Sequence, residues 1–204
     1  MTVLNDSDVK AQLEDAIWVS HQLFARNKVS GSSANLSFRH GDNLVISASG
    51  STLGQMSVDD FSVIDFSGRL LEGRKPSKEW PLHVAFYQRS KDCGAVLHTH
   101  SFYSVLWSCM DHKNPVDIVP KYTPYLEMKL GKIGLIPYAP PGSQELFAYA
   151  KQNIELADGF LLSHHGPIVP GKNILDAFNI LEELEESCRI AWEFKDHPEI
   201  TRIS

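Results

Sequence analysis

Cysteine and positive charge are both scarce in this 204-residue chain. The three cysteines, Cys93, Cys109 and Cys188, stand far apart and form no CxxC pair, which argues against a disulfide framework and against a thiolate zinc finger. Lys and Arg number 19 against 25 Asp and Glu, a net charge of −6, and no basic run stands out. We therefore expect no nucleic-acid partner, and a reducing cytoplasm fits the cysteine usage.

Long apolar runs are missing as well. The first 28 residues carry charges at Asp6, Asp8, Lys10 and Glu14, so they lack the basic region and apolar stretch of a signal peptide. No apolar run approaches the roughly 18 residues of a membrane span. Neither GxxxxGK[ST] nor GxGxxG occurs, which leaves nucleotide binding without support. We expect a soluble cytoplasmic protein with no membrane partner.

The composition that remains is globular. Hydrophobic residues make up 43% and charged residues 22% of the chain, with length enough for one core. Apolar spacing predicts helices over residues 8–27, 57–60, 80–90, 102–109, 143–153 and 173–195. Bounded apolar runs predict strands over 34–39, 44–47, 62–66, 69–71, 94–100, 132–138 and, last, 160–165, with hairpin turns at 40–43 and 67–68. We predict a single α/β domain over residues 1–204, its mostly antiparallel central sheet covered by helices.

The tripeptide His98-Thr99-His100 is the most informative local feature. On a strand, side chains alternate between faces, so both imidazoles would project to the same side within reach of one ion. A third imidazole could come from His164 or His165, at the end of another predicted strand. Three histidines with an open position form a catalytic zinc site. The alternative is a pair of ordinary surface histidines.

Glu79 stands just before the predicted helix that opens at Pro81. A carboxylate at such a junction can be partly desolvated and directed into a cleft, where it serves as a general acid or base. The alternative is an ordinary helix-start glutamate, favoured there by the helix dipole.

Small polar loops occur at 31–35, 47–52 and 76–77. Their hydroxyls, amide and glycine-freed backbone N–H groups could hold a phosphate without a P-loop. The alternative is ordinary turn chemistry, which also produces Gly and Ser clusters.

Five ordered motifs together resemble the class II aldolase/adducin family: residues 31–37, 49–50, 75–80, 98–101 and 161–166. The resemblance spans almost the whole chain, and ordered motifs are far more specific than any one alone. It implies that Zn²⁺, or another divalent metal, is bound by His98, His100 and His165. Because His164 precedes His165 directly, the sequence leaves open which of His164 and His165 binds the metal. It assigns Glu79 as the acid/base carboxylate and as a further metal contact when substrate is absent. The phosphate-binding positions that it implies are Ser33, Asn35, Ser49, Gly50, Ser77 and Lys78.

Within the family, residues 123–125, 128–131, 136–142 and 180–186 look most like the 3-oxo-tetronate 4-phosphate decarboxylases. That likeness implies loss of CO₂ from a four-carbon keto sugar-acid phosphate through a metal-stabilised enediolate, giving dihydroxyacetone phosphate. Tyr125 falls near the tyrosine that fuculose phosphate aldolases use as a proton donor. Lys78 stands where those aldolases have a second serine.

Three other functions remain open from the sequence. A class II sugar-phosphate aldolase, acting on fuculose, rhamnulose or ribulose phosphate, would use the same metal site. A methylthioribulose phosphate dehydratase is a weaker alternative from the same fold. A non-catalytic adducin-like interaction module is disfavoured because the metal histidines and Glu79 are all present. The family resemblance also implies a homotetramer with sites at subunit interfaces.

Overall fold

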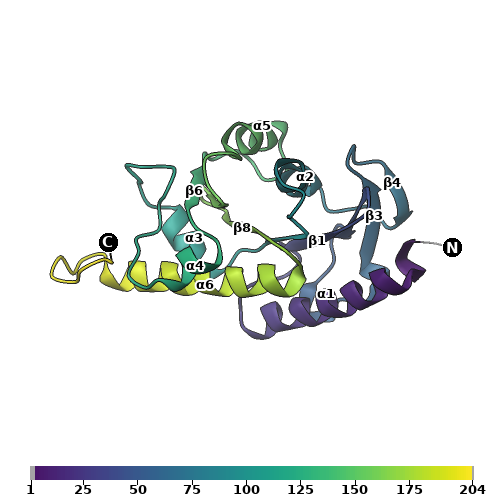
Figure 1. Cartoon of the computed structure of the whole chain (residues 1–204), viewed down its shortest axis with the longest axis horizontal. Coiled ribbons are helices and arrows are strands. Elements are labelled where there is room, and N and C mark those ends of the chain that lie inside the picture. Colours follow the sequence, from purple (N-terminus) through teal and green to yellow (C-terminus); the bar gives the residue numbers. More distant parts are fainter. Residues whose placement is uncertain (1–2, 204) are drawn as a thin grey trace.

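An eight-stranded sheet organises the chain, of which the computed structural model describes residues 3–203 (Figure 1). The strand order is β4-β3-β2-β1-β5-β8-β7-β6. Strands β6 and β7 pair in parallel, and the other neighbouring strands pair antiparallel. The strands are β1 (Asn35–His40), β2 (Asn43–Ser47), β3 (Phe61–Asp65), β4 (Leu70–Gly73), β5 (Ala95–His98), β6 (Ile133–Ile136), β7 (Gly159–Leu162) and β8 (Gly166–Gly171).

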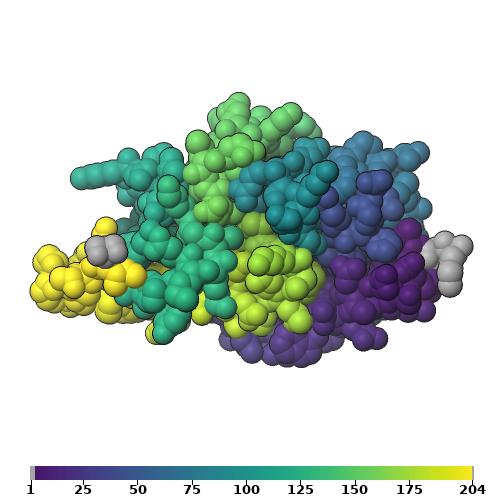
Figure 2. Space-filling model, in the orientation of Figure 1, coloured from purple at the N-terminus to yellow at the C-terminus, as the bar shows by residue number. Residues whose placement is uncertain are grey.

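Helices cover both faces of this sheet. The α-helices are α1 (Ser7–Ala25), α2 (Trp80–Arg89), α3 (Phe102–Ser108), α4 (Tyr125–Lys129), α5 (Gln144–Asn153) and α6 (Ile174–Phe194), and short 3₁₀ helices span Val3–Asn5, Leu53–Gln55 and Val58–Asp60. Figure 1 shows α1 and α6 along one side of the sheet and α2 and α5 along the other. In Figure 2 the purple start of α1 and the yellow segment after α6 lie at opposite ends of the long axis.

Two apolar clusters fill the spaces between helices and sheet. One joins α1 and α6 to the sheet and includes Leu36 and Phe38 of β1. The other joins α2 and α5 to the opposite face. Burying a Leu or Phe side chain contributes about 1.5–3 kcal/mol relative to exposure. Because side chains alternate along a strand, Ser37 faces the other way, toward His83 of α2.

The predicted fold class is confirmed: this is a single α/β domain with a mostly antiparallel sheet. The two predicted hairpins form as β1–β2 and β3–β4. The predicted helix starts also agree, since side chains of Asp6, Ser143 and Asn173 accept hydrogen bonds from backbone N–H groups in the first turns of α1, α5 and α6. Such caps satisfy donors that the helix itself leaves unpaired.

The prediction that 160–165 is the last strand is wrong. Strand β7 ends at Leu162, and Gly166–Gly171 forms a further strand, β8, between β5 and β7. Two prolines and two glycines within six residues are typical of a turn, because proline cannot donate to a sheet. Although the Pro167 nitrogen cannot donate, the Pro167 carbonyl oxygen still accepts a hydrogen bond from the backbone N–H of Thr99 at 3.2 Å. All six residues of β8 are buried.

Two further differences from the sequence prediction concern the end of β5 and an additional helix. Strand β5 ends at His98, so His100 lies beyond the sheet. The five-residue helix α4 was not predicted. A segment that short holds little more than one turn, which gives no periodicity to detect.

Among the residues that the structure describes, no helix combines the length and apolar character that a membrane crossing requires.

Candidate metal and substrate site

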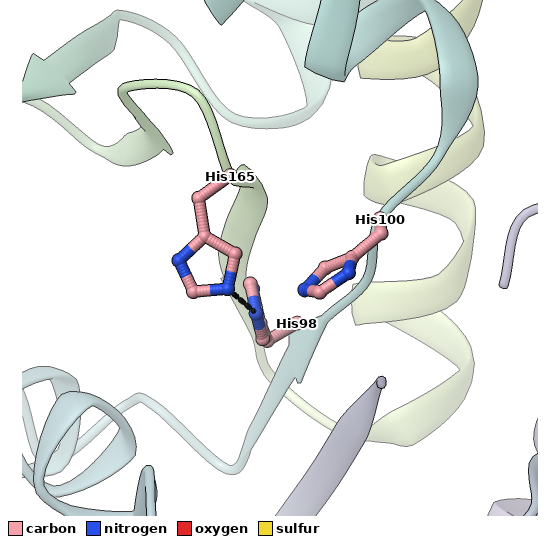
Figure 3. Close-up of side chains that lie close together, drawn as sticks. All are labelled: His98, His100 and His165. Carbon is pink, nitrogen blue, oxygen red and sulfur yellow. Dashed lines mark hydrogen bonds between the residues drawn. The ribbon is translucent and has the colours of Figure 1, made fainter. Parts of the chain in front are cut away.

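Three imidazoles converge where strands β5 and β8 meet (Figure 3). His98 ends β5, His100 follows two residues later, and His165 lies in the turn between β7 and β8. The ring centroids are 5.2 Å apart for His98 and His100, 4.8 Å for His98 and His165, and 4.7 Å for His100 and His165. One ring nitrogen from each residue lies within 4.8 Å of the other two. The cluster therefore presents three nitrogen donors to one small volume.

Gly166 makes this approach possible. A Cβ atom at Gly166 would lie 2.2 Å from the Thr99 carbonyl oxygen, a distance no side chain tolerates. The missing side chain lets the turn before β8 press against the segment that carries His98 and His100. The preceding residue, His164, adopts a left-handed backbone conformation (φ 54°) and is exposed. The structure thus brings His165, and not His164, to the other two imidazoles.

Burial favours the neutral form of all three histidines. Burial lowers the pKa of His98 to about 3, with a further contribution from His100. Burial also lowers the pKa of His165 and of His100. The Nδ1 atom of His98 lies 2.8 Å from the Pro167 carbonyl oxygen, which can only accept, so Nδ1 carries the proton and Nε2 has a free lone pair. Neutral imidazoles with free lone pairs are the form that binds metals.

Two nitrogens meet at short range in this cluster. His98 Nε2 lies 3.2 Å from His165 Nε2, the contact drawn in Figure 3. Because His98 Nε2 has no proton to give, this contact is favourable when His165 Nε2 carries a proton or when the two nitrogens share a cation. The Nε2 atom of His100 has no hydrogen-bond partner among the residues that the structure describes, which leaves it available to the same cation.

Glu79 adds a buried carboxylate to the cluster. It occupies the N-cap position of α2, where its side chain makes no capping hydrogen bond, and is 4% exposed. Its Oε2 atom lies 3.5 Å from His98 Nε2, and its Oε1 atom lies 3.8 Å from His165 Nε2. Oε1 has no hydrogen-bond partner among the described residues, a costly state for a buried carboxylate oxygen. Three imidazoles and a carboxylate are the donor set that zinc prefers, so the residues present fit a divalent cation.

A cavity of about 220 Å³ opens onto Glu79, His100 and His165. All six positions that the resemblance assigned to phosphate binding line it: Ser33, Asn35, Ser49, Gly50, Ser77 and Lys78. The loops reach one place because the backbone N–H of Ser49 donates to the Lys75 carbonyl at 2.8 Å and that of Ser77 donates to the Ser47 carbonyl at 3.0 Å. Polar groups from three distant segments therefore surround one ligand-sized space.

Four cavity residues were not among the predicted binding positions: Ser32, Ala34, Ala48 and Pro141. Ser32 lies within the 31–35 loop, whose serines could not be ranked from sequence. Pro141 accepts a hydrogen bond from Lys78 Nζ at 3.1 Å, a long-range contact without a local signal. Tyr125, unlike the predicted phosphate-binding residues, does not line this cavity. It is the first residue of α4 and is 57% exposed.

The chain matches the class II aldolase and adducin N-terminal domain over residues 14–192. It belongs to this family, as the ordered motifs predicted. Decarboxylases and aldolases are named among its relatives, which confirms the prediction of a carbon–carbon lyase.

Three relatives illustrate the match. A 3-oxo-tetronate 4-phosphate decarboxylase of Haemophilus influenzae is 39% identical over 88% of this chain and 86% of its own length. An L-fuculose phosphate aldolase of Methanococcus maripaludis is 35% identical over 85% of this chain and 92% of its own. The crystal structure of YgbL from Klebsiella pneumoniae superposes with a TM-score of 0.91 at 32% identity, covering 96% of this chain and 94% of that one.

Proposed function

We propose that the chain is a zinc-dependent decarboxylase that converts 3-oxo-tetronate 4-phosphate into dihydroxyacetone phosphate and CO₂. The observation that carries the proposal is the convergence of three imidazoles beside Glu79. Of these residues, His100, His165 and Glu79 line a cavity that also exposes hydroxyls and Lys78. A relative with 39% identity is named for this substrate.

Substrate binding places the phosphate against the loop residues. The hydroxyls of Ser33, Ser49 and Ser77 and the ammonium of Lys78 line the same cavity, and donors of both kinds suit a phosphate. Binding the phosphate at a distance from the reacting carbon fixes the orientation of the keto acid, which lowers the entropic part of the barrier.

The chemistry requires a place for the electrons that CO₂ leaves behind. A divalent cation held by His98, His100 and His165 supplies Lewis acidity that stabilises negative charge on a carbonyl oxygen. As the bond to CO₂ breaks, its electron pair forms an enediolate, whose terminal carbon must then take a proton. The Oε1 atom of Glu79 has no hydrogen-bond partner among the described residues and lies beside the imidazoles. Glu79 therefore takes a proton from water on Oε1 and passes it to this carbon.

An L-fuculose-type sugar-phosphate aldolase is the second candidate, because a relative with 35% identity is named for it. Aldol cleavage passes through the same enediolate, so the imidazoles and Glu79 serve either reaction. The reactions differ at the other fragment. An aldolase must take a proton from the hydroxyl that becomes the aldehyde in cleavage, and return it to that oxygen in condensation, whereas a decarboxylase releases neutral CO₂. Sequence likeness in 123–142 to the decarboxylases favours the latter.

Product analysis distinguishes the two reactions. We expect 3-oxo-tetronate 4-phosphate to yield equal amounts of CO₂ and dihydroxyacetone phosphate. We expect dihydroxyacetone phosphate mixed with lactaldehyde or glycolaldehyde to condense slowly or not at all. Coupled assays of CO₂ and of dihydroxyacetone phosphate measure the first reaction, and chromatography of sugar phosphates measures the second. Efficient condensation without CO₂ release from the keto acid would favour the aldolase.

Ser77 tests the phosphate-binding part of the proposal. We expect Ser77→Ala to raise KM for the phosphorylated substrate by roughly 10-fold, the value of one hydrogen bond to a charged group. Because Ser77 Oγ also accepts from the Glu79 backbone N–H at 3.3 Å, kcat is measured alongside KM. The non-phosphorylated keto acid is the control, since its KM should not change. Equal KM values for wild type and variant would remove Ser77 from phosphate binding.

The remaining assignments belong to the same proposal. We propose that residues 1–204 act as one domain in the cytoplasm, as a homotetramer with sites at subunit interfaces. Tyr125 is the second proton donor of the proposal, and its 57% exposure outside the cavity of its own chain is compatible with such an interface.

A further inference from the structure

Polar side chains of β1 face polar side chains of α2 in register. Asn35 and Ser37 are two residues apart on β1. Glu79, at the N-cap position of α2, is followed at intervals of four residues by His83 and Tyr87 within the helix. Two strand residues span about 6.6 Å and four helix residues about 6.0 Å, so successive pairs stay aligned. We call these five residues the β1–α2 polar ladder.

Hydrogen bonds connect the ladder from end to end. Tyr87 OH lies 2.8 Å from Ser37 Oγ, which lies 2.8 Å from His83 Nδ1. His83 Nε2 bonds to Asn35 Oδ1, and Asn35 Nδ2 donates to Glu79 Oε2 at 3.0 Å. All five residues are buried, with His83 and Ser37 fully so. The ladder therefore ends on the carboxylate of the proposed acid/base.

The direction of each bond follows from the chemistry of the groups. The Asn35 NH₂ group donates to Glu79 Oε2 at 3.0 Å, so the Asn35 oxygen faces His83. That oxygen only accepts, so His83 Nε2 must carry the proton. Burial lowers the pKa of His83 to about 3, with a smaller contribution from His98, which leaves the ring neutral with one N–H. Nδ1 of His83 consequently accepts from Ser37, whose oxygen accepts from Tyr87.

We propose that His83 is a positioning residue for Glu79, acting through Asn35. Its Nε2–H fixes the orientation of the Asn35 amide, so that Nδ2 holds Glu79 Oε2 and leaves Oε1 free for the reacting carbon. The proposal rests on the proposed role of Glu79. Asn35, which also lines the phosphate cavity, then has a second role, because it orients Glu79.

The ladder explains why this position needs histidine. If the Asn35 amide turned over, its oxygen would point at the carboxylate, and two acceptors would repel each other at a largely buried position. An apolar residue at position 83 leaves the Asn35 oxygen without a donor and removes one of the two contacts that oppose that rotation. Small errors in the placement of a proton-transfer group reduce rates by up to about 10²-fold.

His83→Phe and His83→Gln form the test pair. Phenylalanine keeps an aromatic ring and removes both nitrogens, whereas glutamine retains an N–H donor that can reach Asn35. We expect His83→Phe to lower kcat by roughly 10-fold to 10²-fold with KM changed less than about twofold and metal content unchanged, and His83→Gln to restore most of kcat. His112→Phe is the matched control, since His112 bonds a backbone carbonyl at 2.7 Å and does not line the cavity. It should keep wild-type kcat.

A wild-type kcat in folded His83→Phe, or a loss that His83→Gln does not restore, overturns the proposal. The rate is measured on whichever of the two lyase reactions the wild-type chain catalyses, so a change of substrate assignment leaves the comparison valid. Nitrogen-15 NMR of the histidine side chains tests the ladder without any turnover. We expect the His83 signal, assigned by its loss in His83→Phe, to show the Nε2–H tautomer from pH 5 to 8. The Nδ1–H tautomer there would contradict the bond directions and with them the proposal.

Discussion

The double substitution His98→Ala with His100→Ala is expected to abolish both metal binding and turnover. The wild-type chain should contain about one divalent cation, zinc in this proposal. Two of the three imidazoles that lie within 4.8 Å of one another come from these residues, and one imidazole with one carboxylate cannot retain the ion. Elemental analysis of the purified proteins measures the metal, and CO₂ release measures turnover.

His164→Asn is the control for this experiment. It lies beside His165 but is exposed, and asparagine tolerates its left-handed backbone conformation (φ 54°) better than most residues. We expect this variant to keep its metal and its activity. Full metal content in the double variant would reject the three-histidine assignment.

Glu79→Gln is expected to reduce the rate by roughly 10²-fold or more while leaving the fold and most of the metal in place. Glutamine preserves the shape of the side chain and can still accept the hydrogen bond from Asn35 Nδ2. It cannot transfer a proton. The three imidazoles remain to hold the cation. Single-turnover kinetics, circular dichroism and elemental analysis measure the three properties separately.

Glu145→Gln separates catalysis from helix stabilisation. Glu145 lies in the first turn of α5, as Glu79 lies at the start of α2, so both variants lose a favourable interaction of about 0.3–1 kcal/mol with a helix dipole. Only the Glu79 variant should lose activity. If the two variants have equal rates, Glu79 is an ordinary helix-start residue, which was the alternative considered from sequence.

Several features of this protein follow from its sequence alone. Helical and alternating periodicities predict the long helices and the two hairpins, because amphipathic patterns report which face each element buries. The spacing of His98 and His100 predicts two imidazoles on one side, and they do converge although β5 already ends at His98. The family motifs indicate the lyase class, which the relatives confirm.

The tertiary structure decided what depends on contacts between distant segments. Strand β8 has a turn-like sequence, and it forms because β5 and β7 flank it on both sides. The choice of His165 over its neighbour follows from the close contact of Gly166 with Thr99. His83 shows the same principle most clearly: its local sequence is that of an ordinary amphipathic helix, whereas its partner Asn35 is 48 residues away. Periodicity records which way a side chain points but not what it meets there, and hydrogen-bond partners and pKa values are set by the group that it meets.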